Sequence, residues 1–135
     1  MALINWSEDY SVHVKEMDEQ HKKLIAMIND LNDAMKSGKS KDIMDKILKG
    51  LIDYTVFHFG AEEKLMKSNN YPGYQQQKTQ HESLTKKVME YQERLNSGKM
   101  VMGVEVMNFL KDWLINHIKG LDTKYGPFLN SKGIA

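Results

Sequence analysis

The chain has 135 residues, which is the length of a single domain and is enough to bury a core without a disulfide or a structural metal. It has no cysteine, which excludes a disulfide framework, an iron–sulfur cluster, a thiolate zinc site and a cysteine nucleophile, and which is consistent with a reducing, cytoplasmic location. Lysine and arginine number 19 against 18 acidic residues, and the two signs are interspersed, so we expect no nucleic acid as a partner. No apolar stretch approaches the length of a membrane span, so we expect no membrane insertion, and we expect a monomer.

The spacing of apolar residues predicts an all-α protein. Residues 1–17 are expected to form an irregular N-terminal arm, because their apolar residues follow no helical period. Apolar residues then recur at steps of three and four and predict helices over about 18–37, 40–67, 74–96 and 103–120. The last segment, 121–135, contains Gly126-Pro127 and is predicted to be a short C-terminal loop. Four amphipathic helices with short connections favour an up-down-up-down four-helix bundle.

Each predicted helix carries one histidine on its apolar stripe. On the second helix, His58 and Glu62 are four residues apart, so they lie one turn apart on the same face. In an up-down-up-down bundle, the starts of the first and third helices meet the ends of the second and fourth. We therefore expect His21, His58, Glu62, His81 and His117 to converge at one level of the core.

A histidine on an apolar stripe is, taken alone, more often a hydrogen-bonded core residue than a metal ligand. Four histidines at one level with a buried glutamate favour a metal, because a buried carboxylate without a partner is unstable. Imidazole and carboxylate ligands suit iron, manganese or zinc, and carboxylates from different helices suit two ions. Asp122 follows His117 by five residues and would point elsewhere on a regular helix, but a departing turn at Gly120 would bring it inward.

At these residues the sequence resembles the hemerythrin family, and in particular the single-domain bacteriohemerythrins. The resemblance covers nearly the whole chain and rests on these segments: Asn5-Trp6, Asp18-Glu19-Gln20-His21, His58-Phe59-Gly60-Ala61-Glu62-Glu63, Tyr71-Pro72-Gly73-Tyr74, His81, Trp113-Leu114-Ile115-Asn116-His117-Ile118 and Asp122. It implies a centre of two non-haem iron ions bridged by Glu62, Asp122 and an oxo or hydroxo group. His21 and His58 would bind one iron, with His81 and His117 on the other.

The same resemblance implies that dioxygen binds reversibly, as a hydroperoxide, at an open position on the iron held by His21 and His58. The protein would then store, deliver or sense oxygen, with delivery to an oxygen-using enzyme as one role, and would not be an enzyme itself. Tyr125 is implied as a close neighbour of the ligands. The implied walls of the dioxygen pocket, which keep water and protons away, are Leu24, Phe59, Trp113, Leu114 and Ile118.

One position departs from the family pattern. The family places two histidines four residues apart on the third helix, and this chain has Gln77 and His81 there. The second iron would then have the Gln77 amide, a water or a vacancy in place of the third histidine. An amide oxygen is a weaker ligand than imidazole for a ferrous ion, so we predict reduced metal affinity at the second site, by roughly 10 to 100-fold or more. Two alternatives to an oxygen-binding protein stay open: a di-iron oxidase or peroxidase-like enzyme, and a bundle with one metal or none that acts through protein contacts.

Overall fold

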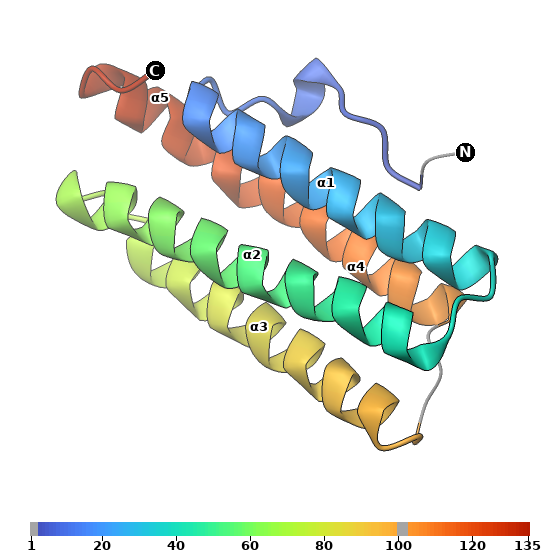
Figure 1. The fold of residues 1–135 in the computed structure, drawn as a ribbon. Helices are drawn as coiled ribbons and strands as arrows, with labels where there is room; N and C mark the ends of the chain where they lie inside the picture. The colour runs from blue at the N-terminus through green and yellow to red at the C-terminus, as the bar shows by residue number, and fades with distance from the viewer. Residues whose placement is uncertain (1–2, 100–102) are drawn as a thin grey trace.

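The computed structural model describes residues 3–99 and 103–135, and the predicted arm residues 1–2 and the loop residues 100–102 lie outside that description. Its main elements are four antiparallel helices, shown in Figure 1. The helix α2 packs against both α1 and α3, and α1 packs against α4. The prediction of an all-α four-helix bundle is confirmed. The helices span α1 (Lys15–Lys36), α2 (Lys41–Ser68), α3 (Tyr74–Asn96) and α4 (Val104–His117).

Local chemistry explains where these helices begin and end. The hydroxyl of Ser40 accepts a hydrogen bond from the backbone N–H of Ile43 and caps the start of α2. Gly38 and Gly98 follow the ends of α1 and α3 with φ of 66° and 75°, the left-handed conformation that stops a helix. The first helix begins at Lys15, three residues earlier than predicted, and Asp18 lies within its first turn.

The N-terminal arm is tied to the bundle at both of its ends. The carboxylate of Asp18 accepts hydrogen bonds from the Ser11 hydroxyl at 2.6 Å and from the Val12 N–H at 2.8 Å. Farther along α1, the side chain of Asn29 exchanges two hydrogen bonds with the backbone of Ile4. Between these ties the arm includes a single 3₁₀ turn, η1 (Glu8–Tyr10), and runs along the outside of α1 (Figure 1).

The prediction of a C-terminal loop over 121–135 is wrong for most of that segment. The helix α4 continues as a π-helical turn, η2 (Ile118–Asp122), and then as α5 (Thr123–Ser131), which lies near the start of α1 at the upper left of Figure 1. Pro127 lies inside α5. The cause is packing, because Tyr125 and Leu129 lie four residues apart and are both 1 % exposed, so their burial outweighs the poor helix propensity of proline.

The apolar core is divided into two clusters. The larger cluster fills most of the bundle and includes Leu24, Leu31, Leu51, Phe59, Val88, Leu110 and Leu114. The smaller cluster lies beyond it, where the arm, the start of α1, the end of α2 and α5 meet, and consists of Val12, Val14, Met17, Met66, Tyr125 and Leu129. A layer of buried polar residues separates the two clusters, and it contains the predicted histidine and carboxylate ligands.

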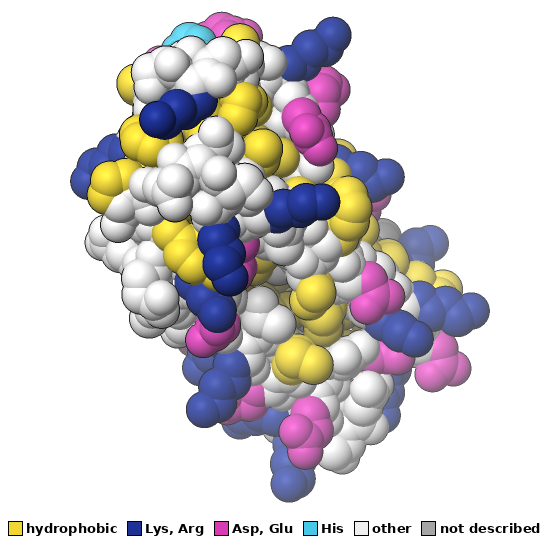
Figure 2. All heavy atoms as spheres, turned by 90° about the vertical axis from the view of Figure 1, so that its left-hand side faces the viewer, with side chains coloured by type: hydrophobic (Ala, Val, Ile, Leu, Met, Phe, Trp, Pro, Cys, Tyr) yellow, Lys and Arg dark blue, Asp and Glu magenta, His cyan; other side chains and the backbone are white. Residues whose placement is uncertain are grey.

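The outer surface carries charges of both signs, and on the face seen in Figure 2 they are interspersed with small apolar patches. Within 3–99 and 103–135, we find no helix with the length and apolar character needed to cross a membrane.

Candidate metal centre

The polar layer brings together side chains from all four helices of the bundle. On each helix the layer lies between residues of the two clusters; on α1, for example, His21 lies between Met17 of the smaller cluster and Leu24 of the larger cluster. Each of the predicted ligand positions is at most 3 % exposed: His21, His58, Glu62, Gln77, His81, His117 and Asp122. The layer is therefore a closed polar site inside an apolar bundle.

Two groups of donor atoms in this layer could each hold a metal ion. One group consists of His21, His58 and Glu62, and the other of Glu62, His81, His117 and Asp122. Within each group the donor atoms lie within 4.8 Å of one another. Because Glu62 belongs to both groups, the two positions are adjacent, as in a dinuclear centre.

Both carboxylates reach across the two groups. Glu62 places one oxygen 3.3 Å from His21 Nε2 and the other 3.1 Å from His58 Nε2 and 3.4 Å from His81 Nε2. Asp122 places one oxygen 3.1 Å from His21 Nε2 and the other 3.2 Å from His117 Nε2. Glu62 and Asp122 are therefore placed to bridge two ions.

The π-helical turn explains how Asp122 enters the layer. On a regular α-helix, residues five apart are rotated well away from each other, because each residue turns the chain by about 100°. In the turn η2 the hydrogen bonds run from residue i to i+5, so that Asp122 returns to the face of His117. The expected departure from regular geometry is present, but as a wider turn and not as the end of the helix. A Cβ at Gly120 would meet no atom within 4 Å, so the turn does not need a glycine there to avoid a clash.

Three histidines of the layer are oriented by partners that the sequence reasoning missed. In each of them the nitrogen Nδ1, on the outer side of the ring, contacts an oxygen of a neighbouring side chain. The pairs are His58 with Gln20 Oε1 at 2.7 Å, His81 with Glu63 Oε2 at 3.0 Å and His117 with Gln80 Oε1 at 3.0 Å. Each partner atom accepts the Nδ1 proton, which leaves the Nε2 lone pair facing inward. Among these partners, Gln20 could have been found from the sequence, since it lies on the buried stripe of α1 beside Met17, His21 and Leu24.

With these tautomers, several inward atoms have lone pairs that face each other. His81 Nε2 and His117 Nε2 are 3.1 Å apart, and His58 Nε2 is 3.1 Å from a Glu62 oxygen that has no hydrogen-bond donor. Gln77 Oε1 is a further buried acceptor without a partner. Facing acceptors repel one another unless a cation lies between them, so the donor set fits bound metal ions.

The charged side chains of the layer shift one another's pKa values. Burial alone would lower the pKa of His21, but hydrogen bonds to Asp122 and Glu62 and the charges of both carboxylates raise it from 6.5 to about 10. Burial would raise the pKa of both carboxyls, and the charge of Glu62 would raise that of Asp122 further, yet the protonated forms of the facing histidines hold the pKa of Glu62 well below its usual range and also lower that of Asp122. The protein without metal is therefore expected to carry a positive charge on His21, which a metal ion must displace.

Tyr125 lies against the same carboxylate from the smaller apolar cluster. Its hydroxyl donates a hydrogen bond of 2.5 Å to Glu62 Oε2. Burial, followed by the charges of Glu62 and Asp122, raises the pKa of Tyr125 well above its usual value, so the hydroxyl keeps its proton and remains a donor.

On the other side of the layer is a small apolar cavity of about 20 Å³. Such a volume holds about one water-sized molecule. Four of the five predicted pocket residues line it, namely Leu24, Phe59, Trp113 and Leu114, whereas Ile118 is buried in the same cluster but does not line the cavity. Further lining residues are Ile28, Leu51, Thr55, Leu84, Val88 and Leu110.

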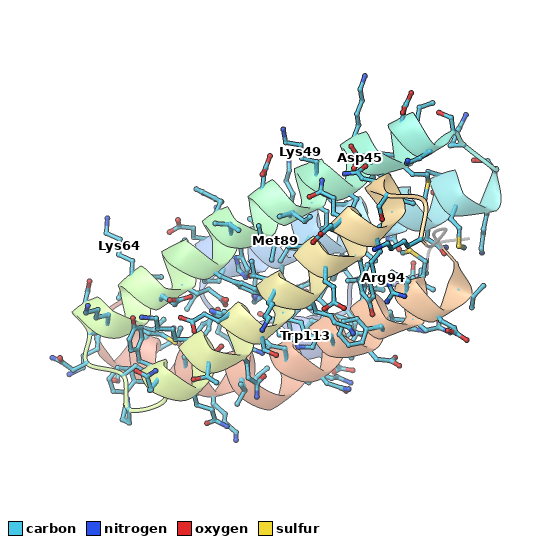
Figure 3. The ribbon with its side chains drawn as sticks, turned by 90° about the horizontal axis from the view of Figure 1, so that it is seen from below. Asp45, Lys49, Lys64, Met89, Arg94 and Trp113 are labelled. Atoms are coloured by element: carbon cyan, nitrogen blue, oxygen red, sulfur yellow. The ribbon has the colours of Figure 1, made fainter. Side chains whose placement is uncertain are left out.

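Two aromatic residues of the cavity also cover the histidines. Phe59 stacks on His81 with ring centroids 3.8 Å apart, and Trp113 stacks on His117 at 4.5 Å. Figure 3 shows Trp113 on α4, on the side that faces α3. The cavity and the polar layer therefore share these walls.

Comparison with known proteins decides the family. The pattern of the hemerythrin HHE cation binding domain matches residues 12–129. The chain belongs to the hemerythrin family. It is 34 % identical to a bacteriohemerythrin of Methylococcus capsulatus over 132 residues, which cover 97 % of this chain and 100 % of that protein. It is 38 % identical to a hemerythrin-like protein of Naegleria gruberi over 121 residues, or 90 % of this chain and 89 % of that protein.

Solved hemerythrin structures have the same fold. A wild-type hemerythrin crystal structure matches with a TM-score of 0.89 at 33 % identity, covering 93 % of this chain and 97 % of that one. A point mutant of hemerythrin matches with a TM-score of 0.90, also at 33 % identity, covering 94 % and 97 %. The identification of the chain as a single-domain bacteriohemerythrin is thus supported along nearly its whole length.

Proposed function

We propose that this hemerythrin binds dioxygen reversibly at a centre of two non-haem iron ions. The observation that carries the proposal is the pair of adjacent donor groups that share Glu62, with Asp122 in contact with histidines of both. His21 and His58 would hold one ion, His81 and His117 the other, and both carboxylates would bridge them. When bound, two ferrous ions supply the electrons that hold dioxygen reversibly.

The protein residues hold the ligands and protect them. Gln20, Glu63 and Gln80 fix three imidazoles with their Nε2 atoms inward, which reduces the reorganisation needed on metal binding. The Tyr125 hydroxyl keeps one oxygen of Glu62 in place. The apolar cavity lined by Leu24 and Phe59 admits a small neutral molecule and excludes water and protons, which favours release of dioxygen over irreversible oxidation of the ions.

The role that follows is oxygen storage, delivery or sensing, and not catalysis. Gln77 supports one alternative, because replacing an imidazole by a weaker amide ligand would lower metal affinity at the second site. A vacant position there would admit water or peroxide and would favour oxidase or peroxidase-like chemistry. The Gln77 side chain is buried in the layer and donates a hydrogen bond to Asp122, which supports an effect on the second ion.

The deciding experiment measures iron per chain together with the visible spectrum after anaerobic reduction and exposure to air. We expect close to two iron ions per chain and an absorption band that appears with oxygen and fades when oxygen is removed. One iron ion or none, or direct conversion to an oxidised product, would contradict reversible binding. Turnover with a reductant and peroxide would instead support the oxidase or peroxidase alternative.

A further inference from the structure

The two atoms of the Gln77 amide have different surroundings. Its nitrogen Nε2 donates a hydrogen bond of 2.9 Å to Asp122 Oδ1, the same oxygen that lies 3.2 Å from His117 Nε2. Its oxygen Oε1 is buried without any hydrogen-bond donor in the described structure. A carbonyl oxygen so enclosed needs a positively charged or hydrogen-bonding neighbour to offset its lost hydration.

Gln77 lies next to the second donor group, because its amide contacts Asp122, a member of that group. Gln77 is one helical turn before His81 on α3, so both side chains are on the same face, and both are 1 % exposed. Through Nε2 the amide also orients Asp122, a member of the group with His81 and His117. One amide is therefore placed to supply a ligand oxygen and to fix a neighbouring carboxylate.

We propose that Gln77 Oε1 binds the second ion and shifts the preference of this position, relative to a position with three imidazoles, toward a harder divalent cation such as Mn²⁺. The inference rests on the proposed metal centre. With Gln77 included, the second ion would have two imidazole nitrogens, from His81 and His117, and three oxygens, from Glu62, Asp122 and Gln77. The first would have the imidazoles of His21 and His58 with oxygens of the shared carboxylates.

The selectivity follows from the preferences of the ligand atoms. Carboxylate and carbonyl oxygens suit Mn²⁺, whereas imidazole suits Fe²⁺, Co²⁺ and the later metals. An amide oxygen at position 77 therefore weakens the binding of Co²⁺ or Fe²⁺ more than the binding of Mn²⁺. The second position would accept manganese beside an iron in the first position more readily than a position with three imidazoles would.

The test titrates the metal-free protein with Mn²⁺ and, separately, with Co²⁺ under anaerobic conditions. Free Mn²⁺ is followed by electron paramagnetic resonance, and bound Co²⁺ by visible absorption. We expect two ions per chain in the unaltered protein, and in Q77L a second Mn²⁺ bound about tenfold or more weakly, as for the loss of other metal-supporting groups. In Q77H, we expect the ratio of Co²⁺ to Mn²⁺ affinity at the second position to rise by about tenfold or more.

Matched controls use Gln76, the exposed neighbour of Gln77 on α3. Q76L and Q76H should bind both metals as the unaltered protein does. Circular dichroism checks that each variant is folded, and Q77N, which keeps the amide but shortens the side chain by one methylene, serves if Q77L does not fold. Q77N should also weaken the second Mn²⁺.

Each remaining result overturns the inference in a recognisable way. If Q77L and Q77N bind the second Mn²⁺ as tightly as the unaltered protein, Gln77 is not a ligand. If the ratio of Co²⁺ to Mn²⁺ affinity at the second position is the same in Q77H and in the unaltered protein, residue 77 does not set the metal preference. If the unaltered protein binds no ion, the proposed di-iron function fails as well, whereas two ions bound regardless of residue 77 leave that function intact.

Discussion

His21 differs from the other histidines of the centre in the charges that it meets. Its Nε2 contacts both Glu62 and Asp122, whereas its Nδ1 has no hydrogen-bond partner in the described structure. The two carboxylates raise its pKa from 6.5 to about 10 against the opposing effect of burial. In the metal-free protein, His21 therefore acts as the internal counter-ion of the two carboxylates.

This shift predicts how the stability of the metal-free protein depends on pH. The folded pKa of His21 is raised, so its stabilising contribution is complete below pH 6.5 and is lost as the pH rises toward 10. For one proton, the free energy of unfolding should fall by about 1.4 kcal/mol per pH unit in that range. Urea denaturation at pH 7, 8 and 9 measures the slope. H21N should flatten it, and an unaltered protein whose stability rises with pH would contradict the assignment.

At the residue scale, the sequence was enough to place the side chains that follow a helical period, but not to identify their hydrogen-bond partners. The histidines and Glu62 could be placed because they interrupt apolar stripes, whose geometry is fixed by the helix. Glu63 and Gln80 are partly exposed and look in the sequence like ordinary solvated residues. Only the packing of α2, α3 and α4 shows that they contact His81 and His117.

Among the elements, the π-helical turn η2 sets the position of Asp122. Inserting one alanine after Gly120 should place Asp122 six residues from His117 and rotate Asp122 and α5 by about 100° relative to His117. We expect this insertion to abolish binding of at least one metal ion, as measured by metal content, while circular dichroism remains helical. The substitution G120A is the control, because a Cβ at Gly120 meets no atom within 4 Å, and it should bind metal normally. Full metal content in the insertion variant would show that the position of Asp122 relative to His117 is not required.

The packing of α5 against the arm depends on Gly126. A Cβ at this position would overlap the backbone carbonyl of Val12, which cannot move as a side chain can. We expect G126A to lower the free energy of unfolding by about 1–3 kcal/mol, the usual effect of overpacking, and to expose the arm. Urea denaturation and proteolysis near Lys15 measure both effects. G120A is again the matched control, and equal stability of the two variants would contradict the close approach.

The elements also show why the C-terminal segment was mispredicted. Gly126-Pro127 is a typical loop signal, and the local preference of these residues argues against a helix. The helix forms because Tyr125 and Leu129 bury their side chains in the smaller apolar cluster, with Val12, Met17 and Met66. Those contacts join segments that are distant in the sequence, so a reading of local preferences could not find them. The four main helices were predicted because each has a long apolar stripe.

At the scale of the whole molecule, the polar layer lies between two apolar clusters that can pack without it. We therefore expect the metal-free protein to keep its helices. Its free energy of unfolding should be lower than that of the metal-bound protein only by the free energy that ion binding contributes. At a free metal concentration of 100 times the Kd, the bound ion should add about 2.7 kcal/mol to the free energy of unfolding. Urea denaturation with metal and with a chelator measures the difference. Unfolding on chelation alone would show that the two clusters do not suffice.

The stacking of Trp113 on His117 has a practical consequence for anyone who follows the centre in solution. The chain has two tryptophans, and Trp113 lies 4.5 Å from the His117 ring, whereas Trp6 belongs to the arm and lies beside Tyr10 and Lys22. A paramagnetic ion on His117 quenches the fluorescence of a tryptophan in van der Waals contact with that ring. The indole of Trp113 is therefore a built-in optical reporter of the second position, and a W6F variant would remove the unchanging background.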